Sequence, residues 1–444
     1  MLLHLKRGLD IAIQGEPEGP IQEAPEPRHV GLVGLDYIDL KPSMAVAIGD
    51  RVHTGQPLVR HRLHPQLAYT APGAGRITDI HRGPKRSLES VVIELTDHED
   101  PAPVIPNPPP TPTADEVRGG LAAAGLWSAF RTRPYSRVPP PDGKLGSLFV
   151  TAMDTQPLAP DPAAIIAERE EDFQLGMRCL CTFCPGPVYL CTAPEFSPLV
   201  PASDNLQHVR FAGPHPAGLP GTHIHFLQPG VSLLPDTWYI GYQDVLSIGH
   251  LFRTGCPTFE RVISVAGPGT ADPRLLRTRL GADLRDVIGA DFTPDVRVIS
   301  GSLLSGRRAN PNTRFLGRYH NQVTLIPERR HESARRGLAH RFAHLAADLM
   351  KAGHGPRDKV PTTRLHGWPT GMLSVESFDA VWPLRDPPIP LLRAVLTGDT
   401  ETAAALGCLV LDEEDLALCA YICPSKLDYG SALRDTLRAL ERVG

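Results

Sequence analysis

Apolar and polar positions alternate over short intervals in the first part of the chain. Residues 44–58, 69–80 and 88–95 show this alternation, and glycine turns divide them into short apolar runs. A period of two with glycine turns is typical of β-strands. The pattern predicts one small β module over residues 1–100. The proline-rich residues 101–114 follow it and predict an extended linker.

Strand-like and helix-like segments then alternate. The predicted helices are residues 115–130 and 162–177, and the predicted strands are residues 147–152, 187–191 and 207–212. Residues 238–255 predict a buried helix or crossover. Such alternation favours a mostly parallel sheet covered by helices, so we expect a Rossmann-like α/β domain over residues 115–257.

A second group of strands follows this domain. Residues 260–269 predict a buried strand closed by a Gly-Pro-Gly turn, and residues 296–301 and 322–326 predict two more strands. A short helix is expected at the end of residues 274–288. We therefore place a β domain at residues 258–328 and a mainly helical domain at residues 329–444. The Arg- and His-rich residues 331–354 are an expected helix within the latter.

Composition excludes several classes of protein. The 444 residues are 41% hydrophobic and 21% charged, as expected for a folded globular chain. A net charge of −4 argues against a nucleic-acid-binding protein. No apolar run is long enough to span a bilayer, and the first residues lack a signal-peptide core, which predicts a cytoplasmic location. The eight irregularly spaced cysteines do not suggest a disulfide framework.

Four cysteines are a weak candidate for a metal site. Cys179, Cys181, Cys184 and Cys191 have the spacing C-x-C-x2-C-x6-C, and their thiolates could hold zinc or an iron–sulfur cluster. The spacing matches neither zinc ribbons nor ferredoxins. The favoured interpretation is four reduced cysteines without metal.

A segment rich in aromatic and basic residues is the candidate contact site. Trp127, Phe130, Arg131, Arg133 and Tyr135 combine rings and cations, which suit a flat quinone ring, an anionic lipid surface or a partner protein. The alternative is that the aromatic residues pack in the core and the arginines are solvated. We expect a mixed result, with structural aromatics and functional arginines.

The loop at residues 213–221 has the form of a strand, a glycine-rich loop and a helix, which can bind phosphate. It fits neither the dinucleotide nor the Walker pattern, and its prolines remove backbone donors. We therefore predict no nucleotide there. His215, His223 and His225 are expected to be structural, because no carboxylate is placed to complete a zinc site. No catalytic motif stands out elsewhere.

Several long strings together resemble one family. They are LKRGLDIAI, WYIGYQDVLSIGHLFRTG, ERVISVAGPG, RVISGSLLSG, FLGRYHNQVTLI and the C-terminal LLRAVLTGDTETAAALGCLVLDEEDLALCAYICPSK. Spread in order over nearly the whole chain, they resemble the family formed by the A subunits of bacterial Na+-translocating NADH:quinone reductases.

The resemblance implies a particular architecture. It implies an N-terminal barrel-sandwich hybrid like that of biotinyl and lipoyl carriers, a Rossmann-like α/β domain, a β-grasp domain of the SLBB type and helices at the C-terminus. Carriers present a lysine at a hairpin tip, whereas the corresponding residues 64–66 contain none. We therefore expect a structural module without a prosthetic group.

The resemblance also implies a function. The complex would couple NADH oxidation and ubiquinone reduction to Na+ export, with flavins and iron–sulfur centres in partner subunits. This chain would be a peripheral subunit on the cytoplasmic face of the inner membrane. It would dock on the membrane and flavin-bearing subunits and help to form or cover the quinone site, with no catalytic residue or covalently bound cofactor of its own.

Two alternatives remain open at this point. One is a soluble quinone- or flavin-binding oxidoreductase. The other is the related subunit of a ferredoxin-linked Na+ pump, which carries iron–sulfur clusters near its C-terminus. Cys408, Cys419 and Cys423 fall in the corresponding region, but their pattern lacks the closely spaced pairs that a four-iron cluster needs, so we predict no cluster.

Overall fold

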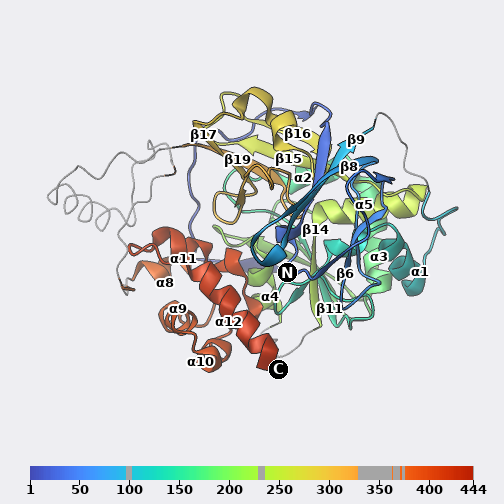
Figure 1. Ribbon diagram of the computed structural model, residues 1–444. Helices are drawn as coiled ribbons and strands as arrows, with labels where there is room; N and C mark the ends of the chain where they lie inside the picture. The colour runs from blue at the N-terminus through green and yellow to red at the C-terminus, as the bar shows by residue number, and fades with distance from the viewer. Residues whose placement is uncertain (97–102, 229–235, 329–362, 364–370, 373–375, 444) are drawn as a thin grey trace.

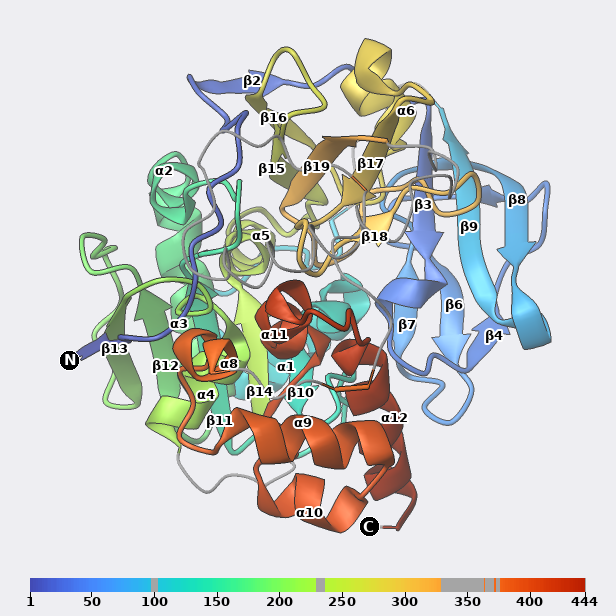
Figure 2. The same cartoon turned by 90° about the vertical axis from the view of Figure 1, so that its left-hand side faces the viewer.

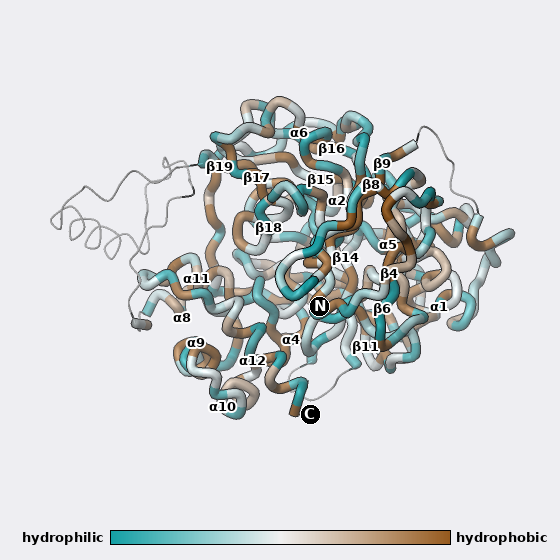
Figure 3. Tube along the Cα trace, viewed as in Figure 1, coloured by the Kyte–Doolittle hydropathy of each residue, from teal (hydrophilic) through white to brown (hydrophobic). Residues whose placement is uncertain are grey.

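The computed structural model describes residues 1–96, 103–228, 236–328, 363, 371–372 and 376–443. It shows a β module, an α/β unit, a second β unit and a group of C-terminal helices packed around one another (Figures 1 and 2). This confirms the expected fold classes. Hydrophobic stretches gather around β14, α5 and β15 in the centre (Figure 3). Within the described ranges, no helix is long and apolar enough to cross a membrane.

Two small sheets form the N-terminal module, in the orders β3-β9-β8-β5 and β4-β6-β7. Val30 and Ile93 from the first sheet and Leu58 from the second are fully buried, as the alternation of apolar positions requires. The elements are β3 (His29–Val33), η1 (Gly34–Asp36), β4 (Pro42–Met44), β5 (Arg51–Val52), β6 (Pro57–His61), β7 (Ala68–Thr70), β8 (Gly75–Arg82), η2 (Pro84–Arg86) and β9 (Leu88–Leu95).

The residues before β3 extend other sheets. Strand β1 (Leu2–His4) pairs in parallel with β13 of the α/β unit, and β2 (Ile21–Glu23) pairs in parallel with β16 of the second β unit. We expected residues 1–100 to form one module, whereas its two sheets begin at His29. Local alternation predicts a strand but does not reveal its partner.

The α/β sheet has the order β1-β13-β12-β11-β14-β10 and is parallel except for β10. The chain runs outward from β11 to β12 and β13, then returns to add β14 on the other side of β11. The strand order therefore reverses between β11 and β14. The strands are β10 (Arg131–Arg133), β11 (Ser147–Ala152), β12 (Val188–Thr192), β13 (Leu206–Ala212) and β14 (Thr237–Gly241).

The two faces of this sheet contact different partners. On β11, Leu148 and Val150 join the core that contains helices α3 and α5, whereas Phe149 joins the core of the C-terminal helices. This follows from the period of two along a strand. Both faces are apolar, as is typical of a parallel sheet covered on each side.

Two predicted helices prove to be interrupted. Residues 115–130 form α1 (Ala114–Ala123) and then η3 (Leu126–Ala129), because Gly125 adopts a left-handed conformation with φ 70°. Residues 162–177 divide at Arg169, whose φ of −136° separates α2 (Pro162–Ala167) from α3 (Glu170–Phe183). The unit also contains α4 (Pro220–Leu227) and α5 (Tyr242–Thr254).

The second β unit has the sheet order β18-β17-β19-β15-β16-β2. The predicted strand at residues 260–269 is β15, and the short helix expected near residue 288 is α6. The elements are β15 (Glu260–Ala266), β16 (Arg274–Arg279), α6 (Leu284–Ile288), β17 (Val296–Ser300), β18 (Arg307–Arg308) and β19 (Gln322–Pro327).

Helices close the chain, as expected. They are α8 (Ser377–Val381), α9 (Pro388–Thr397), α10 (Thr400–Ala405), α11 (Ala417–Ile422) and α12 (Tyr429–Val443), with short 3-10 turns η5 (Cys408–Val410) and η6 (Glu413–Leu416). They pack on the Phe149 face of the α/β sheet through Leu391, Leu416 and Leu437. The helix expected at residues 331–354 lies outside the described residues.

Candidate functional site

A cleft of about 590 Å³ opens where the α/β strand order reverses. Asp154 follows β11 at its rim, and Gly241 ends β14 there. The other walls come from Leu35 to Ile38 of the N-terminal module, from the second β unit and from the segment that begins at Asp412. Ligands of open α/β sheets bind at such reversal points, beyond the carboxyl ends of the strands. The cleft is therefore the candidate site.

Arg131 on β10 lines this cleft. Its guanidinium carbon lies 4.7 Å from the ring centroid of Tyr239 and 4.3 Å from that of Tyr319. Burial by itself would lower the pKa of Arg131, but Tyr239 and Glu414 outweigh that effect and raise the pKa, so the side chain stays charged. Among the described residues the Arg131 side chain forms neither a hydrogen bond nor an ion pair. It is a fixed cation whose donors remain free for a ligand.

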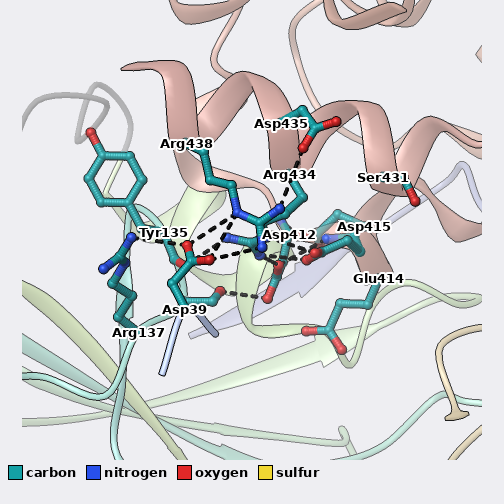
Figure 4. Close-up of polar contacts among 12 residues, drawn as sticks. Asp39, Tyr135, Arg137, Asp412, Glu414, Asp415, Ser431, Arg434, Asp435 and Arg438 are labelled. Atoms are coloured by element: carbon teal, nitrogen blue, oxygen red, sulfur yellow. Dashed lines mark hydrogen bonds and ion pairs between the residues drawn. The ribbon is translucent and has the colours of Figure 1, made fainter. Parts of the chain in front are cut away.

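An acidic segment forms the opposite wall. Asp412 caps η6, and its backbone N–H donates to Asp415 Oδ2 at 2.7 Å in a reciprocal capping box. Arg434 of α12 donates to Asp412 Oδ1 and, through Nε at 2.7 Å, to Glu413 Oε1. Figure 4 shows Asp412 and Asp415 beside Arg434 of α12. A run of acidic residues is typical of a helix N-terminus, so the sequence of this segment does not by itself indicate a cleft wall.

Arg133 lies behind this wall and is 1% exposed. Its Nη1 donates to Tyr239 OH at 2.5 Å and its Nε to the Val410 carbonyl at 3.1 Å. It also pairs with Asp412 at 3.6 Å and with Asp415 at 3.8 Å. Arg133 is thus committed to carboxylates of its own chain and joins β10 to the C-terminal helices.

The acidic segment cannot be fully ionised. Burial raises the pKa of Asp415 to about 8 and that of Glu413 to about 7, and it also raises the pKa of Glu414. Asp412 behaves in the opposite way: burial opposes its charge, but Arg133 overcomes this and lowers its pKa. The wall therefore holds protons at neutral pH that ordinary carboxyl groups would have released.

Asp154 and His320 complete the titratable lining. Burial raises the pKa of Asp154 to about 7, and burial lowers the pKa of His320 to about 4. His320 Nδ1 lies 2.8 Å from Ser300 Oγ, which also accepts the Gly317 N–H. Ser300 has its hydroxyl proton left to donate to Nδ1, and in that tautomer the imidazole proton is on Nε2.

A buried ion triad supports the floor of the cleft. Asp244 Oδ1 accepts from Arg261 Nη2 at 2.8 Å and from Arg318 Nη1 at 2.9 Å. Arg318 also donates its backbone N–H to Asp36 Oδ2 of the N-terminal module. The α/β unit, through Asp244, and the N-terminal module, through Asp36, therefore both meet the second β unit at Arg318.

The glycine-rich loop borders the same cleft through Gly218 and Pro220. The histidines nearby have structural partners: His215 Nδ1 lies 3.1 Å from Thr155 Oγ1, His223 Nε2 lies 2.9 Å from the Ala217 carbonyl, and His225 Nε2 accepts the Arg385 N–H at 3.1 Å. These contacts agree with the expected structural role. That the loop binds no nucleotide stays a prediction.

The four clustered cysteines do not converge. Cys179, Cys181 and Cys184 lie at the end of α3 or just after it, in the core on one face of the sheet, whereas Cys191 on β12 lies in the core on the other face. Burial raises the pKa of the Cys179 thiol to about 12, which disfavours the thiolate that a metal needs. The four thiols are therefore not brought together, and that these cysteines bind no metal stays a prediction.

The C-terminal cysteines are buried too. Cys408, Cys419 and Cys423 are free thiols in the core of the C-terminal helices. Cys423 Sγ lies 3.4 Å from Tyr429 OH. The absence of a cluster there stays a prediction.

The structure separates the predicted contact residues. Trp127 and Phe130 are 2% and 0% exposed and pack with Phe183 and Trp238, so they cannot touch a ligand or partner directly. A core position was the alternative that the sequence left open for these two aromatic residues. Tyr135 is half-buried against the C-terminal helices, and its carbonyl accepts from Arg434 Nη1 at 2.8 Å. Of the five predicted contact residues, only Arg131 lines the cleft.

Sequence analysis missed Asp154, Glu414 and His320. The position of Asp154 directly after a predicted strand was an available signal, because the carboxyl ends of parallel strands share one edge. Nothing local marks His320 or Glu414.

Family comparisons cover most of the chain. Residues 3–96 match the NqrA N-terminal barrel-sandwich hybrid domain, residues 112–257 the NqrA second alpha/beta domain and residues 262–310 the NQRA C-terminal domain. The chain is 46% identical to the A subunit of the Na(+)-translocating NADH-quinone reductase of Pseudomonas aeruginosa (strain UCBPP-PA14), over 100% of both chains. It is 42% identical to that of Saccharophagus degradans, again over 100% of both. The chain therefore belongs to the NqrA family, the A subunits of the Na(+)-translocating NADH-quinone reductases.

Proposed function

We propose that this chain is a peripheral subunit on the cytoplasmic face of the membrane, and that its cleft contributes to quinone binding. It docks on the membrane and flavin-bearing subunits of a complex that couples NADH oxidation and ubiquinone reduction to Na+ export. NADH, the flavins and the iron–sulfur centres belong to those partners, and this chain carries no redox centre. Family membership supports this proposal over a stand-alone soluble oxidoreductase and over the subunit of a ferredoxin-linked pump.

The quinone assignment rests on the side chains that surround Arg131 in the cleft. A quinone ring is flat and has two carbonyl oxygens that accept hydrogen bonds. A guanidinium held between two tyrosine rings offers donors at a fixed position, and the neighbouring rings offer stacking surfaces. Its lack of a protein partner among the described residues means that a ligand carbonyl would displace only water. Neutral His320 offers a second donor through Nε2.

The test uses the reconstituted complex. Arg131→Gln is expected to raise the quinone KM about tenfold or more, because a hydrogen bond from a charged group contributes about 1.5–3 kcal/mol. Reduction of an artificial acceptor by NADH should not change, since that reaction would occur on the partners. Arg178→Gln, an exposed cation on α3, is the matched control. Unchanged quinone kinetics in Arg131→Gln would refute the assignment.

Two further measurements test the proposed membrane association and the proposed absence of a redox centre. The chain expressed alone should fractionate as soluble protein, and with its partners it should sediment with membranes. The purified chain should show neither flavin absorbance nor bound iron. Stoichiometric flavin or a four-iron spectrum would instead support one of the alternatives.

A further inference from the structure

The N-terminal module has a charge opposite to that of the whole chain. Residues 29–95 contain eight lysine and arginine residues and six acidic residues, a net charge of +2, and all eight cations lie between residues 41 and 86, which contain only two of the acids. The whole chain has a net charge of −4, so the residues outside the module carry −6. Such asymmetry orients a protein in the field of a charged partner.

Six of the eight cations gather at one end of the module. Strands β6 and β8 point towards this end, where the β6–β7 and β8–β9 turns lie (Figure 2). Residues 60–68 and 80–88, which form these turns, contain no aspartate or glutamate. We call this surface the basic end; its cations, all exposed, are Lys41, Arg60, Arg62, Arg82, Lys85 and Arg86.

The cations of the basic end lack ion-pair partners among the described residues, although the Glu89 carboxylate lies against Gly83 of the β8–β9 turn. Within the described ranges none of its six cations forms an ion pair, whereas most described arginines outside the module do. Arg60 donates to the Pro65 carbonyl at 3.0 Å and Arg82 to the Arg86 carbonyl at 3.4 Å, and both contacts leave the charge in place. Cations without carboxylate partners favour an anionic surface that lies outside the chain.

The apolar content of this end distinguishes between two kinds of surface. Leu63, at the β6–β7 turn, is 61% exposed and stands alone among cations. A specific protein interface has a contiguous apolar core from which lysine is depleted. Isolated apolar side chains among lysines and arginines are instead typical of segments that bind the headgroup region of anionic bilayers.

We propose that the basic end binds the anionic phospholipid surface, with Leu63 entering the headgroup layer. The proposal rests on the peripheral docking described above and extends it by naming the face that meets the lipid. It also gives a role to the hairpin tip at residues 64–66, which lacks the lysine of carrier proteins. Here the turns would orient the subunit on the bilayer, in addition to its contacts with partner subunits.

The test is flotation of the full-length chain with vesicles of phosphatidylglycerol and phosphatidylcholine, compared with phosphatidylcholine alone. We expect binding to the anionic vesicles at low ionic strength that is lost at physiological salt, where the chain without its partners should be soluble. Lys85→Glu combined with Arg86→Glu should lower the apparent affinity about tenfold or more. Arg60→Glu with Arg62→Glu should do the same from the other turn, and Leu63→Ser should weaken binding without changing the charge.

The matched control is Lys144→Glu with Arg178→Glu, which makes the same charge change at exposed cations outside the module. It should retain vesicle binding, and all variants should keep the melting temperature of the parent. Equal binding to both kinds of vesicle, or an equal loss in the control, would overturn the proposal. So would a parent chain that ignores vesicles while the basic-end variants fail to assemble, because the partner would then be an acidic protein surface. The vesicle assay does not measure quinone kinetics. Its result can therefore contradict lipid binding without contradicting the proposed quinone site.

Discussion

The carboxylate of Asp415 lies directly against the backbone of Gly221, the second residue of α4. A Cβ atom on Gly221 would be 2.4 Å from Asp415 Oδ1. A larger residue than glycine at position 221 would have to displace the Asp415 carboxylate. The C-terminal region therefore contacts the α/β unit at the first turn of α4. The N-terminal end of α4, where the loop could have met a phosphate, is occupied by an acid of the same chain.

Gly221→Ala should therefore destabilise the protein by about 1–3 kcal/mol, the usual cost of overpacking, because the methyl group displaces Asp415 and its partners. Chemical unfolding measures this loss. Gly119→Ala in α1 is the control, because Gly119 has no atom within 4 Å of the added methyl group, and there alanine should stabilise slightly. Equal effects at the two sites would contradict the contact.

Arg133 should matter for folding more than Arg131 does. Arg133→Met takes from buried Asp412 one of its two arginine partners, the other being Arg434, which is expected to cost about 3 kcal/mol, the lower end of the usual loss for a broken buried ion pair. The sequence offered both arginines as contact residues, whereas Arg133 is buried against carboxylates of its own chain. Arg131→Met on the same strand loses only contacts with two rings, about 1 kcal/mol. Thermal melting of the two variants decides the order, and a reversed order would refute this account.

Trp127→Ala should lower the unfolding free energy by about 3–5 kcal/mol, because it opens a cavity in the aromatic core. The variant also removes the hydrogen bond from Nε1 to the Pro139 carbonyl, which is 2.8 Å long. Trp127→Phe keeps most of the volume and should lose clearly less. A large change in quinone kinetics with normal melting would instead show that the ring contacts a ligand.

The stability of the protein should fall as pH rises from about 6 to about 8. An unfolded aspartate has a pKa near ~4, whereas that of Asp415 is about 8 in the folded protein. Between these values the folded state holds a proton that the unfolded state lacks, so the unfolding free energy declines with pH. Glu413, with a pKa of about 7, contributes in the same direction.

Asp415→Asn imitates the protonated acid and should flatten this decline. Denaturant unfolding at a series of pH values measures the slope. Asp435→Asn on α12, whose side chain is 80% exposed, should leave the slope unchanged. If the slope of the Asp415 variant equals that of the parent, the acid is ionised in the folded protein.

Local patterns predicted the elements well and their partners poorly. The strands β13, β15 and β17 lie close to the expected residues, because alternation and glycine turns are properties of neighbouring positions. The break at Arg169 was missed because residues on both sides of it favour helix. The cleft was missed because Arg131, Glu414 and His320 come from three distant segments, and only the tertiary fold brings them together.

The first residues pair with strands far along the chain, which affects folding during synthesis and the choice of fragments. Strand β1 needs β13 as its partner, and β2 needs β16, so β1 stays unpaired until almost half of the protein has been synthesised and β2 until more than half. Contacts so distant in sequence slow folding. Removing residues 1–28 would expose β13 and β16 as open sheet edges, which favour aggregation. A soluble fragment that begins at the first compact module is therefore a poor choice, and an affinity tag is safer at the carboxyl end.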